Sequence, residues 1–308
     1  MYKAGAIDIG TNSMRILIAT IEDNDIVQSF KDLETTRMGE KVDQTGRLSM
    51  DAIDRNIEAL NKFMDIAKKE GITQVPIIAT SAVRDAQNKE VFLERAQNEV
   101  NAKIEVITGD REAELGFLGV IRGLKKKDQN ILVVDIGGGS TELIFGNESG
   151  IQKLVSVDMG AVRMTEKFVK TDPIHPKEKE TMVKEVDNLL ASIMHIFHSL
   201  PIDHVVGIGG TVTTIAAVAK KLRVYDRDAI HQYNLSHKQV KSILNEFCLK
   251  NLQQRKEIPG LHPKRADIIT AGTIILDSIL STLSVKSIKI SEYDNLEGLV
   301  FEQIEKNN

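Results

Sequence analysis

Asp135 suggests chemistry because it ends an apolar run and is followed almost at once by a glycine turn. The run covers residues 131–134, the turn covers residues 137–139, and a second apolar run follows Glu142. Glycine lets the backbone approach a ligand closely, and backbone N–H groups that converge on one point bind phosphate. A carboxylate beside such an anion is repelled unless a metal ion or water lies between them. We therefore predict two strands joined by a phosphate loop.

The same pattern occurs near the N-terminus. A gapless alignment of the two stretches matches Asp8 with Asp135, Gly10 with Gly137, Ser13 with Ser140, and Arg15 with Glu142. Because a repeat of this length is too long for a solenoid, we predict two related domains that each contribute one loop to a shared cleft. The exchange of an arginine for a glutamate predicts complementary roles for the two halves.

Strand and helix patterns alternate along the sequence, which predicts an α/β fold. Beyond a hairpin within residues 4–18, strands are expected at 25–36, 75–80, 103–107, 203–208 and 287–290, with three more within 130–158. Helices are expected at 49–70, 88–100, 111–124, 177–199, 236–253, 264–283 and 294–304. We expect the last helix to return to the first half.

Some residues indicate structure rather than chemistry. We expect Lys125–Lys127 to form a solvated hinge between the halves and not a polyanion track. His195 and His198 lack an acidic partner of the zinc-protease type, and Cys248 lies in a helical pattern, so we expect a packed thiol. None of these is predicted to be a functional residue.

A third glycine turn, at Gly209, Gly210 and Thr211, follows a predicted strand. A Rossmann fingerprint needs glycine or alanine where Val212 stands, and no Gly-Lys-Ser/Thr P-loop occurs. Nicotinamide chemistry and P-loop hydrolysis are therefore disfavoured. The turn is either a tight strand-to-helix junction or a contact for a nucleotide.

Length and composition limit the possible classes of protein. The 308 residues are 42% hydrophobic and 27% charged, which is ordinary for a globular protein of about two domains. The formal net charge of −4 disfavours general nucleic-acid binding but allows a local anion site. No apolar stretch approaches the roughly 18 residues of a membrane span. We expect a cytoplasmic protein with no nucleic-acid or membrane partner.

Six motifs carry a resemblance to a known family. They are Asp8-Ile9-Gly10-Thr11-Asn12-Ser13 with Arg15, Ala79-Thr80-Ser81-Ala82-Val83-Arg84-Asp85-Ala86, Gly109-Asp110-Arg111-Glu112-Ala113, Asp135-Ile136-Gly137-Gly138-Gly139-Ser140-Thr141-Glu142, Gly207-Ile208-Gly209-Gly210-Thr211 and Pro259-Gly260-Leu261-His262-Pro263-Lys264-Arg265-Ala266-Asp267. Together they resemble the exopolyphosphatase/guanosine pentaphosphate phosphatase (Ppx/GppA) family over essentially the whole sequence.

The resemblance implies two actin-like, ribonuclease H-like lobes of the ASKHA superfamily around a central cleft. We expect lobe I at residues 1–124 with the C-terminal helix at 294–308, and lobe II at 125–293. The implied reaction removes the terminal phosphate of inorganic polyphosphate or the 5′ γ-phosphate of pppGpp, an alarmone of the stringent response related to ppGpp. A homodimer and Mg²⁺ or another divalent cation are also implied.

The sequence departs from the family pattern in three places. Arg111 stands beside Glu112 where two adjacent acids are common, and Leu296-Glu297-Gly298 lacks an arginine that is common there. Longer members carry a C-terminal helical domain of HD type, which is not in this sequence. We therefore expect a weaker grip on long polymers.

A protein catalyses phosphoryl transfer mainly by positioning the reacting groups and stabilising their charge. The predicted phosphate-binding residues are Gly10, Thr11, Asn12, Ser13, Arg15, Gly137, Gly138, Gly139, Ser140, Thr141, Gly209, Gly210 and Thr211. The resemblance implies that Glu112 is the catalytic residue that deprotonates water and that Arg84 binds phosphate and balances charge. Asp135 and Glu142, with Asp8 as a further candidate, are expected to bind a hydrated Mg²⁺.

Alternatives remain open at this stage. Glu112 could only complement a helix dipole, Arg84 could pair with Asp85, and Arg265 and Asp267 are expected to be structural or interfacial. Polyphosphate is preferred to pppGpp because no base-recognition site stands out. A kinase or nucleotide-driven switch on the same fold, and a non-catalytic sensor of polyphosphate or alarmone, are the alternatives from other classes.

Overall fold

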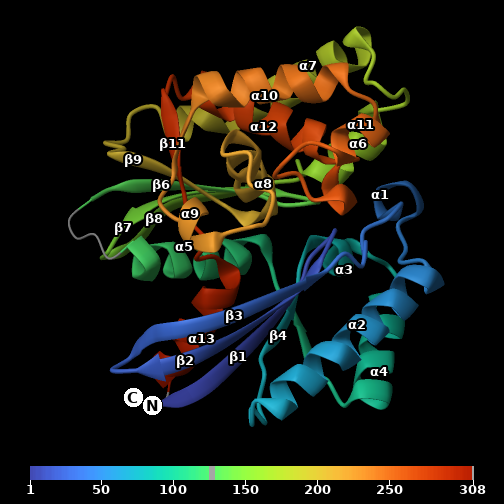
Figure 1. Ribbon diagram of the computed structural model, residues 1–308, viewed down its shortest axis with the longest axis vertical. Helices are drawn as coiled ribbons and strands as arrows, with labels where there is room; N and C mark the ends of the chain where they lie inside the picture. Colours follow the sequence, from blue (N-terminus) through green and yellow to red (C-terminus); the bar gives the residue numbers. More distant parts are fainter. Residues whose placement is uncertain (125–128, 307–308) are drawn as a thin grey trace. The chain divides into compact units, whose positions relative to one another are not determined.

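The computed structural model describes residues 1–124 and 129–306 (Figure 1). Contacts divide the chain into two compact units. Unit 1 is Met1–Gly119 with the C-terminal segment from Asp294, and unit 2 is Val120–Tyr293. The boundary falls within α5 (Gly109–Leu124), whereas the sequence pattern places it after residue 124. The expected hinge at Lys125–Lys127 lies outside the described residues.

Unit 1 is built on a five-stranded sheet with the order β3-β2-β1-β4-β5. The strands β1 (Tyr2–Ile9), β2 (Met14–Glu22) and β3 (Asp25–Glu34) form an antiparallel meander. The short strands β4 (Ile77–Ala79) and β5 (Ile104–Val106) run parallel to β1. Parallel strands need crossover connections, which here contain α2 and α4.

Helices bury the unit 1 sheet. The helix α2 (Met50–Lys69) begins at the Ser49 cap, whose hydroxyl accepts from the Ala52 amide, and it packs on β2 and α4 (Lys89–Val100). The C-terminal helix α13 (Asn295–Lys306) packs against β1 and β2. Two short helices, α1 (Val42–Thr45) and α3 (Ser81–Asp85), complete this unit.

Unit 2 is built on a six-stranded sheet with the order β10-β11-β9-β6-β7-β8. The strands are β6 (Ile131–Ile136), β7 (Thr141–Asn147), β8 (Gly150–Val157), β9 (His204–Ile208), β10 (Asn234–Ser236) and β11 (Ser287–Ile290). The helices are α6 (Ala161–Phe168), α7 (Pro176–Ile193), α8 (Gly209–Ala219), α9 (Arg227–Ile230), α10 (His237–Leu249), α11 (Leu252–Lys256) and α12 (Ile269–Thr282), with 3₁₀ turns at Met194–Ile196 and Pro263–Arg265.

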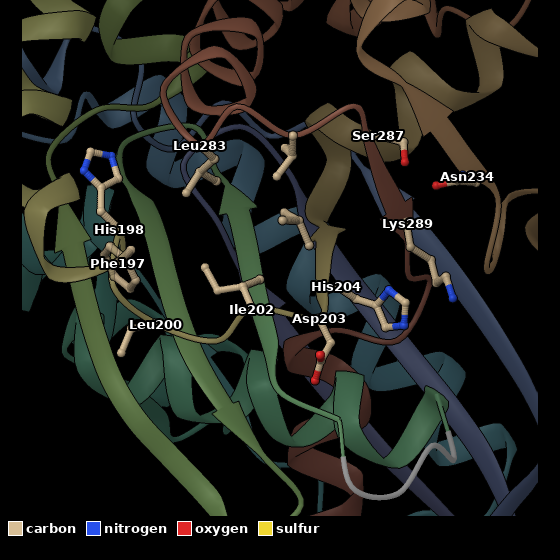
Figure 2. A pocket seen from close by; sticks show the side chains of 12 residues that line it. Phe197, His198, Leu200, Ile202, Asp203, His204, Asn234, Leu283, Ser287 and Lys289 are labelled. Atoms are coloured by element: carbon tan, nitrogen blue, oxygen red, sulfur yellow. The ribbon is translucent and has the colours of Figure 1, made fainter.

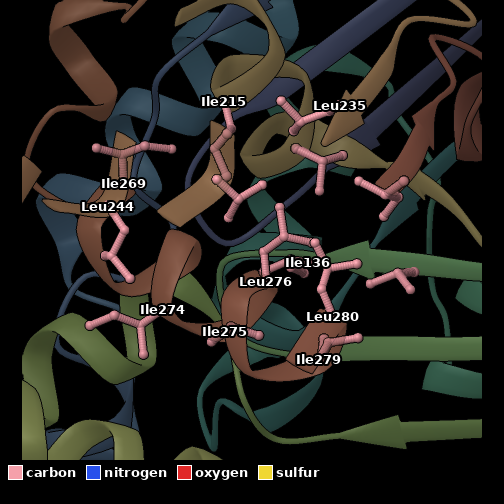
Figure 3. Packing of buried hydrophobic residues seen from close by; sticks show 14 of the residues in the cluster. Ile136, Ile215, Leu235, Leu244, Ile269, Ile274, Ile275, Leu276, Ile279 and Leu280 are labelled. Atoms are coloured by element: carbon pink, nitrogen blue, oxygen red, sulfur yellow. The ribbon is translucent and has the colours of Figure 1, made fainter. Parts of the chain in front are cut away.

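The unit 2 core forms where α12 meets the sheet and its neighbouring helices. Figure 3 shows Ile275 and Leu280 of α12 among side chains from α8, α10, β6 and β10. Eleven of the 14 residues of α12 are buried, so this helix is apolar nearly all round. That composition is expected of a helix enclosed on all sides.

The two sheets confirm the internal repeat predicted from the sequence. In unit 1 the order β3-β2-β1-β4-β5 begins with an antiparallel meander and ends with parallel strands. In unit 2 β8-β7-β6-β9-β11 repeats that order, and β10 adds one antiparallel strand at the edge. Among the described residues, no helix combines the length and apolarity required to span a bilayer.

Three expected helices have different bounds, each for a local reason. The helix expected at 236–253 is two helices, because Asn251 caps α11 in a reciprocal hydrogen bond with Gln254 and so starts a new helix. The helix expected from residue 264 begins at Ile269, after the 3₁₀ turn that follows Pro263. The helix expected at 177–199 ends at Ile193 and tightens into a 3₁₀ turn. The helices α1, α3, α6 and α9 and the edge strand β10 are not predicted by the sequence pattern.

Candidate functional site

The carboxyl ends of three parallel strands form one edge of the unit 1 sheet. Ile9, Ala79 and Val106, the last residues of β1, β4 and β5, lie side by side in the sheet register. The segments that follow them are residues 10–13, which we call the first loop, then α3 and the start of α5. Ligands of open α/β sheets bind at this edge.

The first loop is held by hydrogen bonds that fix its peptide planes. The Gly10 amide donates to the Ser13 carbonyl over 3.0 Å, and the Thr11 and Asn12 carbonyls accept from the amides of Gly39 (2.8 Å) and Arg37 (3.0 Å). A carbonyl and the next N–H belong to one planar trans peptide and point in opposite directions. The N–H groups of Asn12 and Ser13 therefore point away from the 37–39 segment.

The second loop, residues 137–140, has the same arrangement in unit 2. The Gly137 amide donates to the Ser140 carbonyl over 3.0 Å, and the carbonyls of Gly137 and Gly138 accept from the Ala161 and Val162 amides at the start of α6. The Gly139 carbonyl accepts from the Arg163 side chain at 2.8 Å. The N–H groups of residues 138–140 therefore point away from α6, to one side of the loop.

Each loop touches a glycine that lies outside the six sequence motifs. A Cβ on Gly39 would lie 2.3 Å from Thr11 Cγ2, and a Cβ on Gly160 would lie 2.3 Å from the Gly138 carbonyl. Both distances are well below van der Waals contact. At Gly160 the contact is with backbone, so this position admits only glycine while the second loop keeps its shape. At Gly39 the contact is with the Thr11 side chain, which would have to move.

Arg15 forms an ionic bridge within unit 1. It lies directly across the β1–β2 hairpin from Asp8, with its Nη2 2.5 Å from Asp8 Oδ2, and its Nη1 donates to Asp294. Burial alone would raise the pKa of Asp294, but Arg15 and Lys31 outweigh it and lower that pKa to about 2. Burial does raise the pKa of Asp8, whose Oδ1 has no hydrogen-bond partner among the described residues. The expected phosphate contact of Arg15 stays a prediction.

The equivalent pair in unit 2 consists of two carboxylates. Asp135 and Glu142 lie directly across the β6–β7 hairpin, on the sheet face opposite to the main core, and both are buried. Ser156 of β8 donates to Glu142 Oε1 over 2.7 Å. Like charges at directly opposed positions destabilise a sheet unless a cation lies near. Unit 1 supplies an arginine at this position, and unit 2 has a second acid.

Arg84 and Glu112 meet at the unit 1 edge. Arg84 Nη1 lies 3.7 Å from Glu112 Oε2 and donates to the Ile107 carbonyl over 3.1 Å, while its Nε lies 3.6 Å from Asp85. Glu112 is buried in the first turn of α5. The hydroxyls of Thr11 and Ser81 share a buried 2.8 Å hydrogen bond, which joins the first loop to the helix that carries Arg84.

The third glycine turn begins α8, and its glycines make room for two charged side chains. Gly209 has a φ of +80°, and a Cβ there would lie 2.3 Å from Asp135 Oδ1. A Cβ on Gly210 would lie 2.0 Å from Arg265 Nη1, so the guanidinium of Arg265 lies against the turn. The Thr211 hydroxyl donates to the Ile136 carbonyl over 2.8 Å. The turn therefore lies directly against the Asp135 carboxylate.

Several expected phosphate ligands have structural partners. The Thr141 hydroxyl donates to the Met159 carbonyl and Thr141 is fully buried. The Asn12 amide donates to the Ser13 hydroxyl over 3.1 Å. Arg111 binds Glu302 of α13 at 2.5 Å, which gives this departure from the family pattern a structural role. The phosphate contacts of Thr141 and Thr211 stay predictions.

The residues expected to lack function are placed as follows. Cys248 is half-buried against the unit 2 core, and burial raises the pKa of its thiol, which disfavours a nucleophile. Across the described ranges no cluster of three or more His, Cys, Asp or Glu side chains has the arrangement of a metal site. A site formed by two carboxylates, such as Asp135 and Glu142, has fewer side chains than such a cluster of three.

The predicted residues fall into two groups. Gly10, Ser13, Arg84 and Glu112 lie at the strand ends of unit 1, whereas Asp135 and Glu142 lie with the second and third turns at the strand ends of unit 2. Within each unit the structure brings the predicted residues together. The cleft expected between them stays a prediction.

Comparisons with known proteins identify one family. The sequence model of the Ppx/GppA phosphatase family matches residues 17–307. A bifunctional 3-dehydroquinate synthase/phosphatase of Fusobacterium nucleatum is 42% identical over 99% of this chain, which spans 47% of that protein. Exopolyphosphatase 2 of Mycobacterium tuberculosis is 32% identical over 97% of this chain and 98% of its own length.

A third relative has another substrate in its name. The guanosine-5′-triphosphate,3′-diphosphate pyrophosphatase of Vibrio parahaemolyticus is 29% identical over 98% of this chain and 59% of its own length. Among solved structures, the Ppx/GppA family member of Aquifex aeolicus has a TM-score of 0.82 and 32% identity, covering 100% of this chain and 99% of that one. With the two repeated mixed sheets, this likeness confirms the predicted α/β fold of two actin-like lobes of the ASKHA superfamily.

Proposed function

The chain belongs to the Ppx/GppA phosphatase family of hydrolases that act on phosphoric anhydrides, and we propose that its substrate is the end of inorganic polyphosphate. The reaction would release orthophosphate from the terminal anhydride. The observation that carries this proposal is the matching pair of loops, each with its backbone N–H groups turned to one side. Such loops bind phosphate groups without reading any base or sugar. A relative matched over nearly its whole length is named an exopolyphosphatase.

Arg84 and Glu112 provide the charge and the base for this reaction. Phosphoryl transfer needs charge stabilisation and an oriented nucleophile. Glu112 accepts the proton of the attacking water, and Arg84, within 3.7 Å, balances charge on the transferred phosphoryl group. The hydrogen bond from Arg84 to the Ile107 carbonyl holds the guanidinium at the strand-end edge of unit 1. A general base is worth about 10²–10⁴ in rate.

Asp135 and Glu142 are the residues that fit a divalent cation. Mg²⁺ keeps several waters and takes only one or two protein carboxylates, which matches this buried pair. When bound, the ion neutralises charge on the phosphate oxygens. Asp8 fits less well, because Arg15 already holds one of its oxygens. The hydrogen bond from Ser156 orients Glu142 for the ion.

Hydrolysis of pppGpp is the second candidate. It is favoured by the relative named for a guanosine substrate and by Arg265 at the third turn, where a cation could meet a further phosphate. Both candidates use the same two loops, so their geometry does not separate them.

Phosphate release from polyphosphate and from pppGpp, each at several concentrations and without added nucleotide, tests the proposal. We expect kcat/KM to be higher for polyphosphate. A higher value for pppGpp would replace the first candidate with the second. Strict dependence on ATP would indicate a kinase or switch, and saturable binding without release of phosphate would indicate a sensor.

A further inference from the structure

The second loop differs from the first in having glycine at both central positions. In the repeat Gly138 and Gly139 stand where the first loop has Thr11 and Asn12. Glycine adopts positive and negative φ about equally well, so a peptide group in a glycine turn rotates at little cost. The orientation of the peptide between Gly139 and Ser140 therefore depends on the hydrogen bonds that hold its carbonyl.

The two loops hold this carbonyl in different ways. In the first loop the Asn12 carbonyl accepts from a backbone amide, that of Arg37, over 3.0 Å. In the second loop the equivalent carbonyl, that of Gly139, accepts from the side-chain Nε of Arg163 over 2.8 Å. A charged donor forms a stronger hydrogen bond than a neutral amide. Unlike a backbone amide, this donor can be removed by substituting one residue.

Arg163 is well placed to fix the loop. It lies in the first turn of α6, which packs against α7 and α12, and its amide donates to the Gly138 carbonyl over 3.1 Å. One residue therefore holds two consecutive carbonyls. Gly139 is buried and the Arg163 side chain is only 21% exposed, so water does not easily replace the Nε donor. A buried carbonyl that loses its partner costs free energy.

The second loop lies far from the pocket of unit 2. That pocket, of about 340 Å³, opens at the amino ends of β9 and β11, where Figure 2 shows Asp203 and His204. His204 pairs with Ile131 at the start of β6, whereas the second loop follows Ile136 at its end. The five steps of strand between them span about 17 Å at 3.3 Å per residue. Phosphate bound in this pocket would therefore be indifferent to substitutions at Arg163.

We propose that Arg163 is a positioning residue of the second loop, which holds the peptide between Gly139 and Ser140 with the Ser140 N–H toward the phosphate. This role rests on the phosphate binding proposed for the second loop. An N–H group attracts the anion, whereas a carbonyl oxygen turned to the same side would repel it. Arg163 acts through the loop peptide and does not have to touch the substrate.

Arg163→Met and Arg163→Gln test the proposal in the full chain. Methionine keeps the length of the side chain without a donor, whereas the amide nitrogen of glutamine stands where Nε of arginine stands and donates to the same carbonyl. We expect kcat/KM for polyphosphate to fall by about 10–100-fold in Arg163→Met. Arg163→Gln should lose at most about fivefold, because it restores a neutral donor. If pppGpp is the substrate, the same ratios are expected with pppGpp.

Orthophosphate binding provides a readout that does not require hydrolysis, because orthophosphate has no anhydride bond. Titration followed by phosphorus nuclear magnetic resonance gives its dissociation constant. We expect Arg163→Met to weaken binding about tenfold and Arg163→Gln to weaken it at most about threefold. A wild-type chain that shows these ratios but hydrolyses neither substrate would refute the proposed hydrolysis and support the role of Arg163.

Lys167→Met is the matched control. Lys167 is exposed one turn further along α6 and pairs with Glu185 over 2.6 Å, so its loss removes one positive charge from the same helix. It should keep wild-type kcat/KM and orthophosphate affinity. Thermal unfolding by circular dichroism shows which variants are folded, and Arg163→Leu replaces Arg163→Met if the latter does not fold.

Three results would overturn the proposal. The first is wild-type kcat/KM and orthophosphate affinity in a folded Arg163→Met. The second is an equal loss in Arg163→Met and Arg163→Gln, which would show that the hydrogen bond to the Gly139 carbonyl does not matter. The third is an orthophosphate titration of the wild type that does not saturate below about 100 mM.

Discussion

Replacing Gly160 by alanine should move the second loop without touching any side chain of the site. The new Cβ would lie 2.3 Å from the Gly138 carbonyl carbon and oxygen and 2.5 Å from the Gly139 carbon, where ordinary contact begins near 3.4 Å. Because backbone cannot rotate out of the way as a side chain does, the loop must shift by about 1 Å. The φ of Gly160 is −130°, so alanine itself is not strained there.

A shift of about 1 Å in a phosphate-positioning group can cost about 10²-fold in rate. We therefore expect Gly160→Ala to lower kcat/KM for polyphosphate by about 100-fold, measured as orthophosphate release at several substrate concentrations. Thermal unfolding of the same sample shows whether the fold is intact.

Gly71→Ala provides the matched control. A Cβ at Gly71 would meet nothing within 4 Å, but the φ of +76° strains any other residue. That variant should lose about 1 kcal/mol of unfolding free energy and keep wild-type activity. Gly160→Ala, in contrast, should lose activity. If Gly160→Ala retains wild-type kcat/KM, the N–H groups of the second loop do not position the substrate.

Three further predictions follow from the paired side chains. Arg15→Met leaves the carboxylates of Asp8 and Asp294 buried without their cation and should lower the free energy of unfolding by about 3–5 kcal/mol in urea titrations; a loss below about 1 kcal/mol would show that the bridge is unimportant. The folded pKa of Asp294 is about 2 against an ordinary 3.8, so Asp294 contributes about 2 kcal/mol that is lost as the pH falls from about 4 to about 2. Asp294→Asn should lose less stability over that interval than wild type, and an identical acid profile would contradict this. Ser156→Ala should raise the Mg²⁺ concentration for half-maximal activity by about tenfold, and Glu142→Gln should raise it further, whereas unchanged Mg²⁺ dependence in both would exclude this pair as ligands.

The sequence predicts the repeated loops and most of the strands because their signals are local. An apolar run, an acid and a glycine turn lie within one short window in each half, as at Asp8 and Asp135, and the observed turns have the same Gly-to-Ser hydrogen bond. Glu112 and Arg84 were placed by resemblance, and their proximity of 3.7 Å depends on two strands that end level with each other.

The features of the site that the sequence does not reveal depend on contacts between distant parts of the chain. The glycines that fix the loop peptides, Gly39 and Gly160, lie outside both motifs and become visible only through close approach in space. Arg15 and Asp294 are 279 residues apart, so the bridge that occupies this arginine has no local signal. The paired acids Asp135 and Glu142 were predicted as metal ligands, but only the hairpin register shows that they face each other.

Glu112 is the proposed base for hydrolysis, and the Glu112→Gln variant tests that role. The substitution keeps the shape of the side chain and removes its ability to accept a proton at neutral pH. Glu114→Gln is the control, because Glu114 is exposed on the same helix and contacts only Arg111 among the ion pairs of the described chain. We expect kcat for orthophosphate release from polyphosphate to fall by at least about 100-fold in Glu112→Gln, with KM and the unfolding temperature unchanged, and to stay at the wild-type value in Glu114→Gln. Near wild-type turnover of a folded Glu112→Gln variant would show that Glu112 is not the base.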